Sequence, residues 1–144
     1  MIKLMIMAFY NKIGLLVLNK DSTKFLVCQK FPQNVTADYI MPGGQLTEKT
    51  DRECLENEIK EELDCAVDIN SIELIGTYND IAAGRPDRDV EIKLYSGKLI
   101  GKPKPSTEVQ YLHWIGKNDI NNKAVSPIIR NKIMPDLIER KILK

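Results

Sequence analysis

The clearest pattern along the chain is a series of short apolar runs separated by clusters of polar residues. Residues 13–18 (IGLLVL) and 24–31 (KFLVCQKF) are two such runs, and residues 19–22 between them are polar. Short apolar runs bounded by turn residues are typical of strands, so this pair predicts a hairpin. Residues 1–9 are also apolar and predict a buried strand or the lead-in to one. The remaining runs predict strands at 39–41, 71–78, 90–99 and 108–115.

The segment after residue 50 follows a helical period instead. Its apolar positions recur at intervals of three and four residues, which gives a helix one stripe to bury. These positions are Leu55, Ile59, Leu63 and Ala66. Thr50 or Asp51 is the expected N-cap, and Glu53 is well placed for a capping box if Thr50 caps the helix.

A second helix is expected near the C-terminus. Ser126 and Pro127 form a strong start signal, with the serine as N-cap and the proline at the first helical position. Pro135 is expected to kink or divide this helix, because proline cannot donate the backbone hydrogen bond. Residues 79–89 and 101–107, in which Gly or Pro accompanies charged residues, are expected to be loops.

Several strands, one internal helix and one terminal helix indicate a mixed α/β (α+β) chain in which the internal helix packs on a sheet. Its 144 residues fit one domain spanning residues 1–144, long enough to bury a core. The composition, 43% hydrophobic and 28% charged, is ordinary for a globular protein.

The near-neutral charge of the chain limits the kinds of partner that it can attract over a distance. A formal net charge of +1 excludes strong steering of the whole molecule towards nucleic acid or membrane, so anions must be recognised by a local patch. Cys28, Cys54 and Cys65 are odd in number and lack metal-site spacing, which favours a reducing, cytoplasmic location. The N-terminus does not have the pattern of a signal peptide, and no apolar run approaches the length of a membrane span.

Three carboxylates gather on the first helix. Glu58, Glu61 and Glu62 fall within an arc of roughly 100°, where like charges repel one another. A bound cation relieves that repulsion, and Mg²⁺ or Mn²⁺ suits hard oxygen ligands. The alternative is a solvated acidic face. The Pro42-Gly43-Gly44 turn expected upstream favours the site, because glycines let the backbone approach a ligand closely.

This stretch resembles the signature of the Nudix hydrolases, the MutT-like family. The signature reads Gly, five residues, Glu, seven residues, Arg-Glu, an apolar residue, any residue, Glu-Glu, any residue, Gly and an apolar residue. With its last three glutamates on Glu58, Glu61 and Glu62, the signature covers approximately residues 43–65. Three positions depart from it: Lys49 replaces the first Glu, Asn57 the Arg, and Asp64 the final Gly.

The resemblance implies an α/β/α sandwich with a mixed sheet, a central signature helix and a C-terminal helix. It also implies a Mg²⁺ cofactor, which Mn²⁺ can replace, held by glutamates of the signature and a main-chain carbonyl of the glycine turn. The implied metal ligands and catalytic carboxylates are Gly43, Glu58, Glu61, Glu62 and, from a later loop, Glu108. Glu61 is implied either as a ligand or as the base that activates water. For Glu108 the alternative is a carboxylate at a strand end with no such role.

Cationic and aromatic side chains are candidates for the substrate. Arg85 and Arg88 suit phosphate through the guanidinium fork, unless they are ordinary surface arginines. The resemblance implies that Lys30 lies near the cleft in which the family binds its substrate. Candidates to stack a base are Phe31, Tyr39, Tyr78, Tyr95 and Trp114, each of which can equally be a core residue. The single histidine, His113, is expected to be a packed structural residue.

The expected function is Mg²⁺-dependent hydrolysis of a pyrophosphate bond. The substrate is expected to be a nucleotide: a nucleoside diphosphate linked to another moiety, such as ADP-ribose, or a nucleoside triphosphate. Asn57, Lys49 and Asp64 motivate a first alternative, a catalytically weak Nudix-fold module that binds nucleotides or a protein partner. A second is an unrelated metal-binding or interaction protein with an acidic helix. Many members of the family pair, so a homodimer is also expected.

Overall fold

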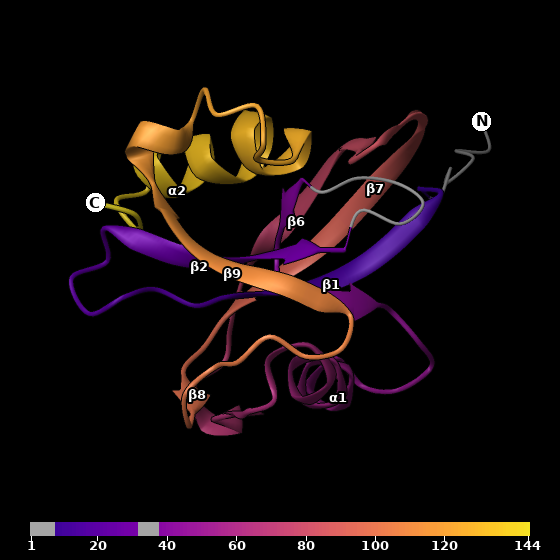
Figure 1. Cartoon of the computed structure of the whole chain (residues 1–144), viewed down its shortest axis with the longest axis vertical. Coiled ribbons are helices and arrows are strands. Elements are labelled where there is room, and N and C mark those ends of the chain that lie inside the picture. Colours follow the sequence, from indigo (N-terminus) through magenta and orange to yellow (C-terminus); the bar gives the residue numbers. More distant parts are fainter. Residues whose placement is uncertain (1–7, 32–37) are drawn as a thin grey trace, which may run out of the picture.

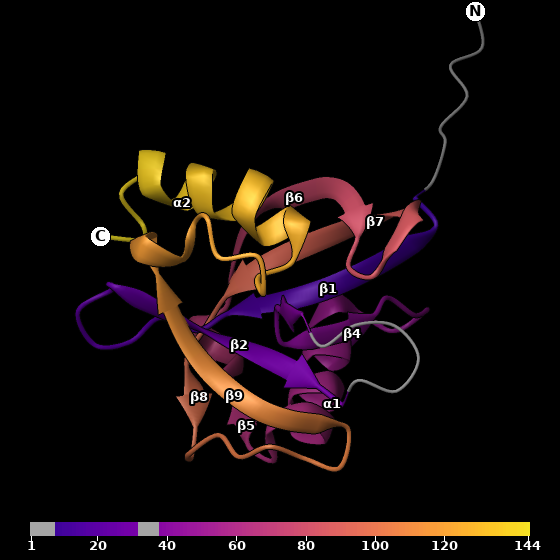
Figure 2. The ribbon, with the colours of Figure 1, turned by 45° about the horizontal axis from the view of Figure 1, so that its top comes forward.

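Two helices enclose the strands from opposite sides (Figures 1 and 2). The structure, a computed structural model, describes residues 8–31 and 38–144. Its helices are α1 (Asp51–Leu63) and α2 (Met134–Glu139), with a π-helical turn at Ile129–Ile133 and 3₁₀ turns at Ile69–Ser71 and Lys117–Asp119. The layers are α1, then the sheets, then α2, so the expected α/β/α arrangement is confirmed.

The strands form two main sheets. They are β1 (Tyr10–Leu16), β2 (Lys24–Lys30), β3 (Tyr39–Ile40), β4 (Gly43–Gln45), β5 (Ala66–Val67), β6 (Glu73–Ala82), β7 (Arg85–Ser96), β8 (Leu99–Ile100) and β9 (Val109–Gly116). One sheet has the order β4-β1-β7-β6, the other has the order β3-β2-β9, and β5 pairs with β8. The β1–β7 pair is parallel and its neighbours are antiparallel, so the sheet is mixed as expected.

The sheets are covered on both faces, and β2 shows how. Phe25 and Val27 pack into the apolar cluster on the α2 side. Leu26 and Cys28 pack into the cluster on the α1 side. Strands buried on both faces carry continuous apolar runs rather than alternating ones, which explains the unbroken sequence of β2.

The expected hairpin between the first two apolar runs is only partly right. An isolated bridge joins Leu18 and Phe25 near the turn. Beyond it the strands separate, because β1 pairs with β7 over seven residues and β2 pairs with β9. Long-range pairing of this kind leaves no local signal in the sequence. Residues 1–7 of the expected N-terminal strand lie outside the described residues.

The prediction of a loop at residues 79–89 is wrong, because β6 and β7 continue through most of this segment as a long hairpin. Ala83 and Gly84 form its turn, and Gly84 has the positive φ of 69° that glycine adopts without strain. The register shifts from the Ala82–Arg85 pair to the Ile81–Asp89 pair, so residues 86–88 bulge out of the ladder. Proline, which cannot donate to a ladder, is tolerated at such a bulge.

The signature helix α1 begins as expected. Thr50 is its N-cap and accepts a hydrogen bond from the Glu53 N–H at 3.2 Å. Of the expected apolar stripe, Leu55, Ile59 and Leu63 are fully buried. Ala66 is a wrong assignment: it is exposed on β5, because the helix ends at Leu63.

The C-terminal helical segment also begins at Pro127 as expected, but Ser126 does not cap it with its side chain. The carbonyl of Ser126 accepts the N–H groups of Ile129 and Arg130, while its hydroxyl has no partner in the described structure. Pro135 lies in the first turn of α2, directly after the π-helical turn; the helical run continues from residue 127 to residue 139, so the expected division is a change from π-helical to α-helical structure and not a break. Figure 2 shows α2 beside the β6–β7 hairpin, where Tyr78 donates to Asp136.

No helix within residues 8–31 and 38–144 is long and apolar enough to cross a membrane. All three cysteines of the sequence are free thiols.

Asp51 fastens the N-terminal end of α1 to β7. Its carboxylate pairs with the Lys93 ammonium at 2.6 Å and accepts a hydrogen bond from the Tyr95 hydroxyl. These two hydrogen bonds, that from Lys93 first, lower the pKa of Asp51 below its ordinary value of 3.8. The contact therefore holds the helix that carries the three glutamates against the sheet.

We expect Asp51→Asn to lower the free energy of unfolding by roughly 0.5–1 kcal/mol at pH 7, because the pair is partly exposed. A lowered folded-state pKa stabilises above the unfolded value of 3.8 and ceases to do so as the pH falls through the folded value. The difference in Tm between wild type and variant should thus shrink below pH 3.8 and then disappear. Thermal unfolding from neutral to acidic pH checks this, with Asp64→Asn at the other end of α1 as control.

Candidate functional site

Two glycines that were expected in a turn lie in a strand instead. Gly43 and Gly44 belong to β4 and pair with Gly14 and Ile13 of β1. Gly43 has φ of 148°, and a Cβ there would lie 2.0 Å from the Ile13 carbonyl oxygen, so only glycine fits. Because the two glycines have no side chains, α1 lies close to this part of β4.

Glu62 is a buried carboxylate with both oxygens engaged. It is 1% exposed, accepts the Gly43 N–H at 2.7 Å, and lies 3.3 Å from the Lys30 ammonium. Burial raises the pKa of Glu62, while Lys30 and the Gly43 N–H oppose that rise. A charge this deep needs such partners, so Glu62, Gly43 and Lys30 form one unit.

Glu58 lies one helical turn earlier and packs on the second glycine. A Cβ at Gly44 would fall 2.1 Å from Oε2 of Glu58, so the carboxylate occupies the space that any side chain there would need. Burial raises the pKa of Glu58, and the negative charges of Glu61 and Glu108 raise it further. Glu61 and Glu108 are both exposed. The four carboxylates therefore share one region, two against β4 and two at its rim.

This arrangement differs from a ready-made metal site. Among the residues that the structure describes, no three Asp, Glu, His or Cys side chains converge closely enough to hold a metal ion. The physical reason is that Glu62 is turned towards Gly43 and Lys30.

The donor chemistry nevertheless suits Mg²⁺, since Glu58, Glu61 and Glu108 offer only oxygen. Gly43 adds a carbonyl. The Leu15 N–H bonds to the Pro42 carbonyl, so by ladder alternation the backbone groups of Gly43 point away from β1.

The departures from the signature have distinct places. Asp64 ends α1 with φ of 49°, a left-handed conformation that glycine adopts freely and aspartate tolerates. Asn57 is exposed and lines a second cavity of about 450 Å³ with Glu56 and Lys60. Lys49 is exposed in the loop before α1. The left-handed residue thus retains the helix ending without glycine.

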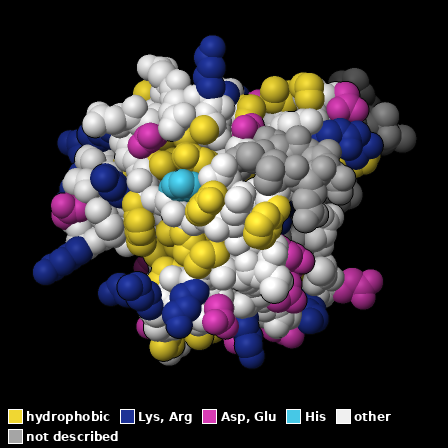
Figure 3. Space-filling model, in the orientation of Figure 1, with side chains coloured by type: hydrophobic (Ala, Val, Ile, Leu, Met, Phe, Trp, Pro, Cys, Tyr) yellow, Lys and Arg dark blue, Asp and Glu magenta, His cyan; other side chains and the backbone are white. Residues whose placement is uncertain are grey.

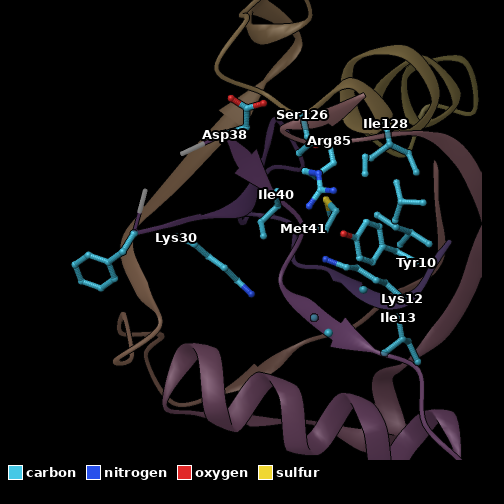
Figure 4. Close-up of a pocket in the computed structure, with 18 residues that line it drawn as sticks. Tyr10, Lys12, Ile13, Lys30, Asp38, Ile40, Met41, Arg85, Ser126 and Ile128 are labelled. Atoms are coloured by element: carbon cyan, nitrogen blue, oxygen red, sulfur yellow. The ribbon is translucent and has the colours of Figure 1, made fainter. Parts of the chain in front are cut away.

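A cavity of about 370 Å³ opens beside the β4 glycines. Its walls are largely apolar, with Met41, Ile92 and Ile128 among the lining residues. Three cationic side chains also line it, from three different strands: Lys12, Lys30 and Arg85. Figure 4 shows the ends of Lys12 and Lys30 directed towards each other, with Arg85 nearer Ser126. The cavity is therefore apolar at one end and positively charged beside the glutamates.

The arginines expected at the substrate are placed differently from each other. Arg85 lines the cavity, with Nε 3.6 Å from the Asp87 carboxylate. Arg88 does not line it. Its guanidinium lies 4.2 Å from the centre of the Phe9 ring and donates to the Tyr10 hydroxyl at 2.9 Å. Tyr10 itself lines the cavity, so Arg88 is connected to the cavity indirectly, through its hydrogen bond to the Tyr10 hydroxyl.

The aromatic candidates are mostly engaged elsewhere. Phe31 lines the cavity, whereas Tyr78 and Tyr95 bond to Asp136 and Asp51. Tyr39 stacks on His113 at 4.2 Å between ring centres, and His113 bonds to Gln29 at 2.8 Å, which confirms a structural histidine. Trp114 is 43% exposed and does not line the cavity. Figure 3 shows hydrophobic side chains around the histidine on this face.

Sequence reasoning missed four polar residues that line the cavity: Tyr10, Lys12, Asp38 and Ser126. Tyr10 and Lys12 share one face of β1 with Leu16, a core residue, so strand alternation could have shown that Lys12 points inward. Ser126 is 2% exposed and its Oγ has no hydrogen-bond partner among the described residues. No sequence signal distinguishes that serine from a helix cap.

The fold is that of the MutT-like Nudix hydrolases. A MutT protein from Methanosarcina mazei Go1 matches with a TM-score of 0.72 and 16% identity, over 92% of this chain and 95% of that one. The E. coli ORF135 protein matches with a TM-score of 0.70 and 16% identity, over 91% and 89%. The NUDIX domain of Shewanella oneidensis NrtR, solved in complex with ADP-ribose, matches with a TM-score of 0.68 and 12% identity, over 94% and 90%.

Identities this low establish likeness of fold. No protein-family model and no curated protein matches the sequence.

The two β4 glycines should respond differently to alanine. Gly43→Ala forces a positive φ and a clash with backbone, so we expect it to lower the free energy of unfolding by more than about 2 kcal/mol. Gly44→Ala meets the Glu58 side chain from Cγ to Oε2 but no backbone, and that side chain can move away, so we expect a smaller loss of about 1 kcal/mol. Denaturant unfolding of both variants measures the contrast. Equal losses would contradict this account of β4.

Proposed function

We propose that the chain is a Mg²⁺-dependent pyrophosphohydrolase of the Nudix type. Its substrate is a nucleoside diphosphate linked to another moiety, such as ADP-ribose, or a nucleoside triphosphate. The observation that carries this proposal is the meeting of two elements at β4: the glutamates of α1 on one side and a cation-lined, apolar cavity on the other. A phosphorylated organic molecule matches both, because its phosphates suit the charged region and its organic part suits the apolar cavity.

Hydrolysis of a phosphoanhydride needs positive charge on the phosphoryl oxygens and an activated water. Mg²⁺ held by Glu58, Glu62 and the Gly43 carbonyl would supply Lewis acidity and a more acidic bound water. Lys30 and Arg85 bind phosphate oxygens from the cavity side. Glu61, exposed and near Glu58, is either a further ligand or the base that takes the proton from water. Glu108 adds a carboxylate at the rim.

The cavity receives the organic part of the substrate. A volume of about 370 Å³ falls in the range of small-molecule sites, which are mostly apolar with a few polar groups. Its buried hydroxyl, on Ser126, is a candidate hydrogen-bond partner for a base or sugar. The ADP-ribose complex of the similarly folded NrtR domain adds support for a ligand of this class.

One observation favours a second function, a nucleotide-binding module with weak catalysis. Lys30 already neutralises Glu62 at 3.3 Å, and Asn57 provides only neutral hydrogen bonds where the family pattern has arginine. In that case the site would bind nucleotides without rapid turnover. The same assays separate the two functions, because one predicts product and the other only affinity.

The deciding experiment measures phosphate or nucleotide release from nucleoside triphosphates, ADP-ribose, sugar nucleotides and dinucleoside polyphosphates, with Mg²⁺ or Mn²⁺. We expect metal-dependent turnover that Glu62→Gln lowers at least 100-fold, because a ligand and the partner of Lys30 are lost. Glu56→Gln is the matched control, since Glu56 is exposed on the same helix and lines the second cavity. Nucleotide binding without product from any substrate would leave the binding module. Turnover that is unaffected by Glu62→Gln would mean that the glutamates are wrongly assigned.

The two arginines give a separate prediction. Arg85→Gln should raise KM about tenfold with little change in kcat, since a charge-assisted phosphate contact is lost from the cavity wall. Arg88→Gln should change KM less than about threefold, because its guanidinium packs on Phe9 outside the cavity. Steady-state kinetics on the best substrate of the panel tests both. An Arg88 effect as large as that of Arg85 would place Arg88 directly on the substrate.

We further propose a homodimer and a cytoplasmic location. Light scattering coupled to size exclusion tests the first. The second is in keeping with the three free thiols, and fractionation of cells tests it.

A further inference from the structure

Lys12 is a cation in an unusual place, inside a strand that the core surrounds. Its neighbours across the sheet are Ile92 of β7 and Gln45 of β4. The side chain enters the cavity, and its end is directed towards that of Lys30 (Figure 4). Burial is the largest influence on the pKa of Lys12, which is lowered, and the nearby Lys30 lowers it further. Lysine is therefore costly at this position.

The three cations of the cavity differ in their counterions. Lys30 has Glu62 at 3.3 Å, and Arg85 has Asp87 at 3.6 Å. For Lys12, no carboxylate oxygen of the described part of the chain lies within 4.0 Å. Glu58 and Glu62 act on it only from a distance. A partly buried ammonium with only the Tyr10 ring at 5.8 Å and two more distant carboxylates is incompletely compensated, and an anionic ligand would complete the compensation.

The position of Lys12 determines which part of a bound ligand it would contact. The glutamates influence it from one side, and Tyr10, whose ring centre is 5.8 Å from the ammonium, lies on the cavity side. It thus stands at the junction of the apolar cavity and the acidic region. An anionic group of a ligand bound at that junction would connect the part of the ligand in the cavity to the part near the glutamates.

We propose that Lys12 binds the phosphate that joins the cavity-held part of the substrate to its pyrophosphate bond. The proposal rests on the proposed function for the identity of the anion. It adds a substrate-binding residue outside the glutamate helix, and it makes part of the affinity for the diphosphate independent of the divalent cation. Lys12 and Lys30 then bind the diphosphate from two strands.

The test measures binding of inorganic pyrophosphate by calorimetry after divalent ions have been removed. We expect Lys12→Met to weaken binding by about 10- to 100-fold, which is the usual effect of losing one charged contact. Lys12→Arg should retain most of the affinity. Lys20→Met, in the exposed turn before β2, is the matched control and should bind as wild type does. Unchanged affinity in Lys12→Met would overturn the proposal and leave Lys12 as a remote counterion of Glu58.

A second measurement uses wild-type protein, so it does not depend on the folding of a variant. Acylation of lysines, followed by mass spectrometry, reports the accessibility of each ammonium. Pyrophosphate should slow labelling of Lys12 and leave that of Lys20 unchanged; equal labelling with and without pyrophosphate would overturn the proposal. Neither measurement needs turnover. An absence of hydrolysis with Lys12-dependent binding would therefore refute the enzyme but retain this contact.

Discussion

The burial of one carboxylate, Glu62, constrains much of the rest of the structure. A charged group that is 1% exposed is tolerated only with close partners, and it has two: the N–H of Gly43 and the ammonium of Lys30. Those partners come from β4 and β2, which belong to different sheets. The buried charge thus ties α1 to both sheets. The cavity opens at the same point, so the contact that anchors the helix also defines the site.

The glycines of β4 explain how a helix comes so close to a strand. Gly44 leaves room for the Glu58 carboxylate, and Gly43 supplies an N–H to Glu62. The degenerate signature retains these contacts, because none of its three substitutions falls on the residues that make them. Asp64 keeps the left-handed helix end that glycine would provide. Asn57 stands where the family pattern has arginine, and it is exposed on α1.

Sequence reasoning succeeded where the signal was local. Helical spacing placed Glu58, Glu61 and Glu62 near one another on α1, although they do not converge on one point among the described residues, and Thr50 was one of the two expected N-caps. It failed where distant pairing decides the outcome. The residues expected as a loop became part of the β6–β7 hairpin because each strand offers the other a ladder. Alternation along β1 could indicate the face on which Lys12 lies, but the neighbours of that face depend on the position of β1 between β4 and β7, which its own segment does not encode.

The tip of the β6–β7 hairpin separates two properties of the molecule. The bulge of residues 86–88 and the two-residue turn hold Arg85 over the cavity, far along the chain from the glutamates. Insertions or deletions at this tip would reshape the cavity wall while leaving α1 and β4 unchanged. The cavity wall can therefore diverge in evolution, or be altered in the laboratory, without rebuilding the carboxylate region. The hairpin tip is the natural place to diversify in a library that seeks new ligands.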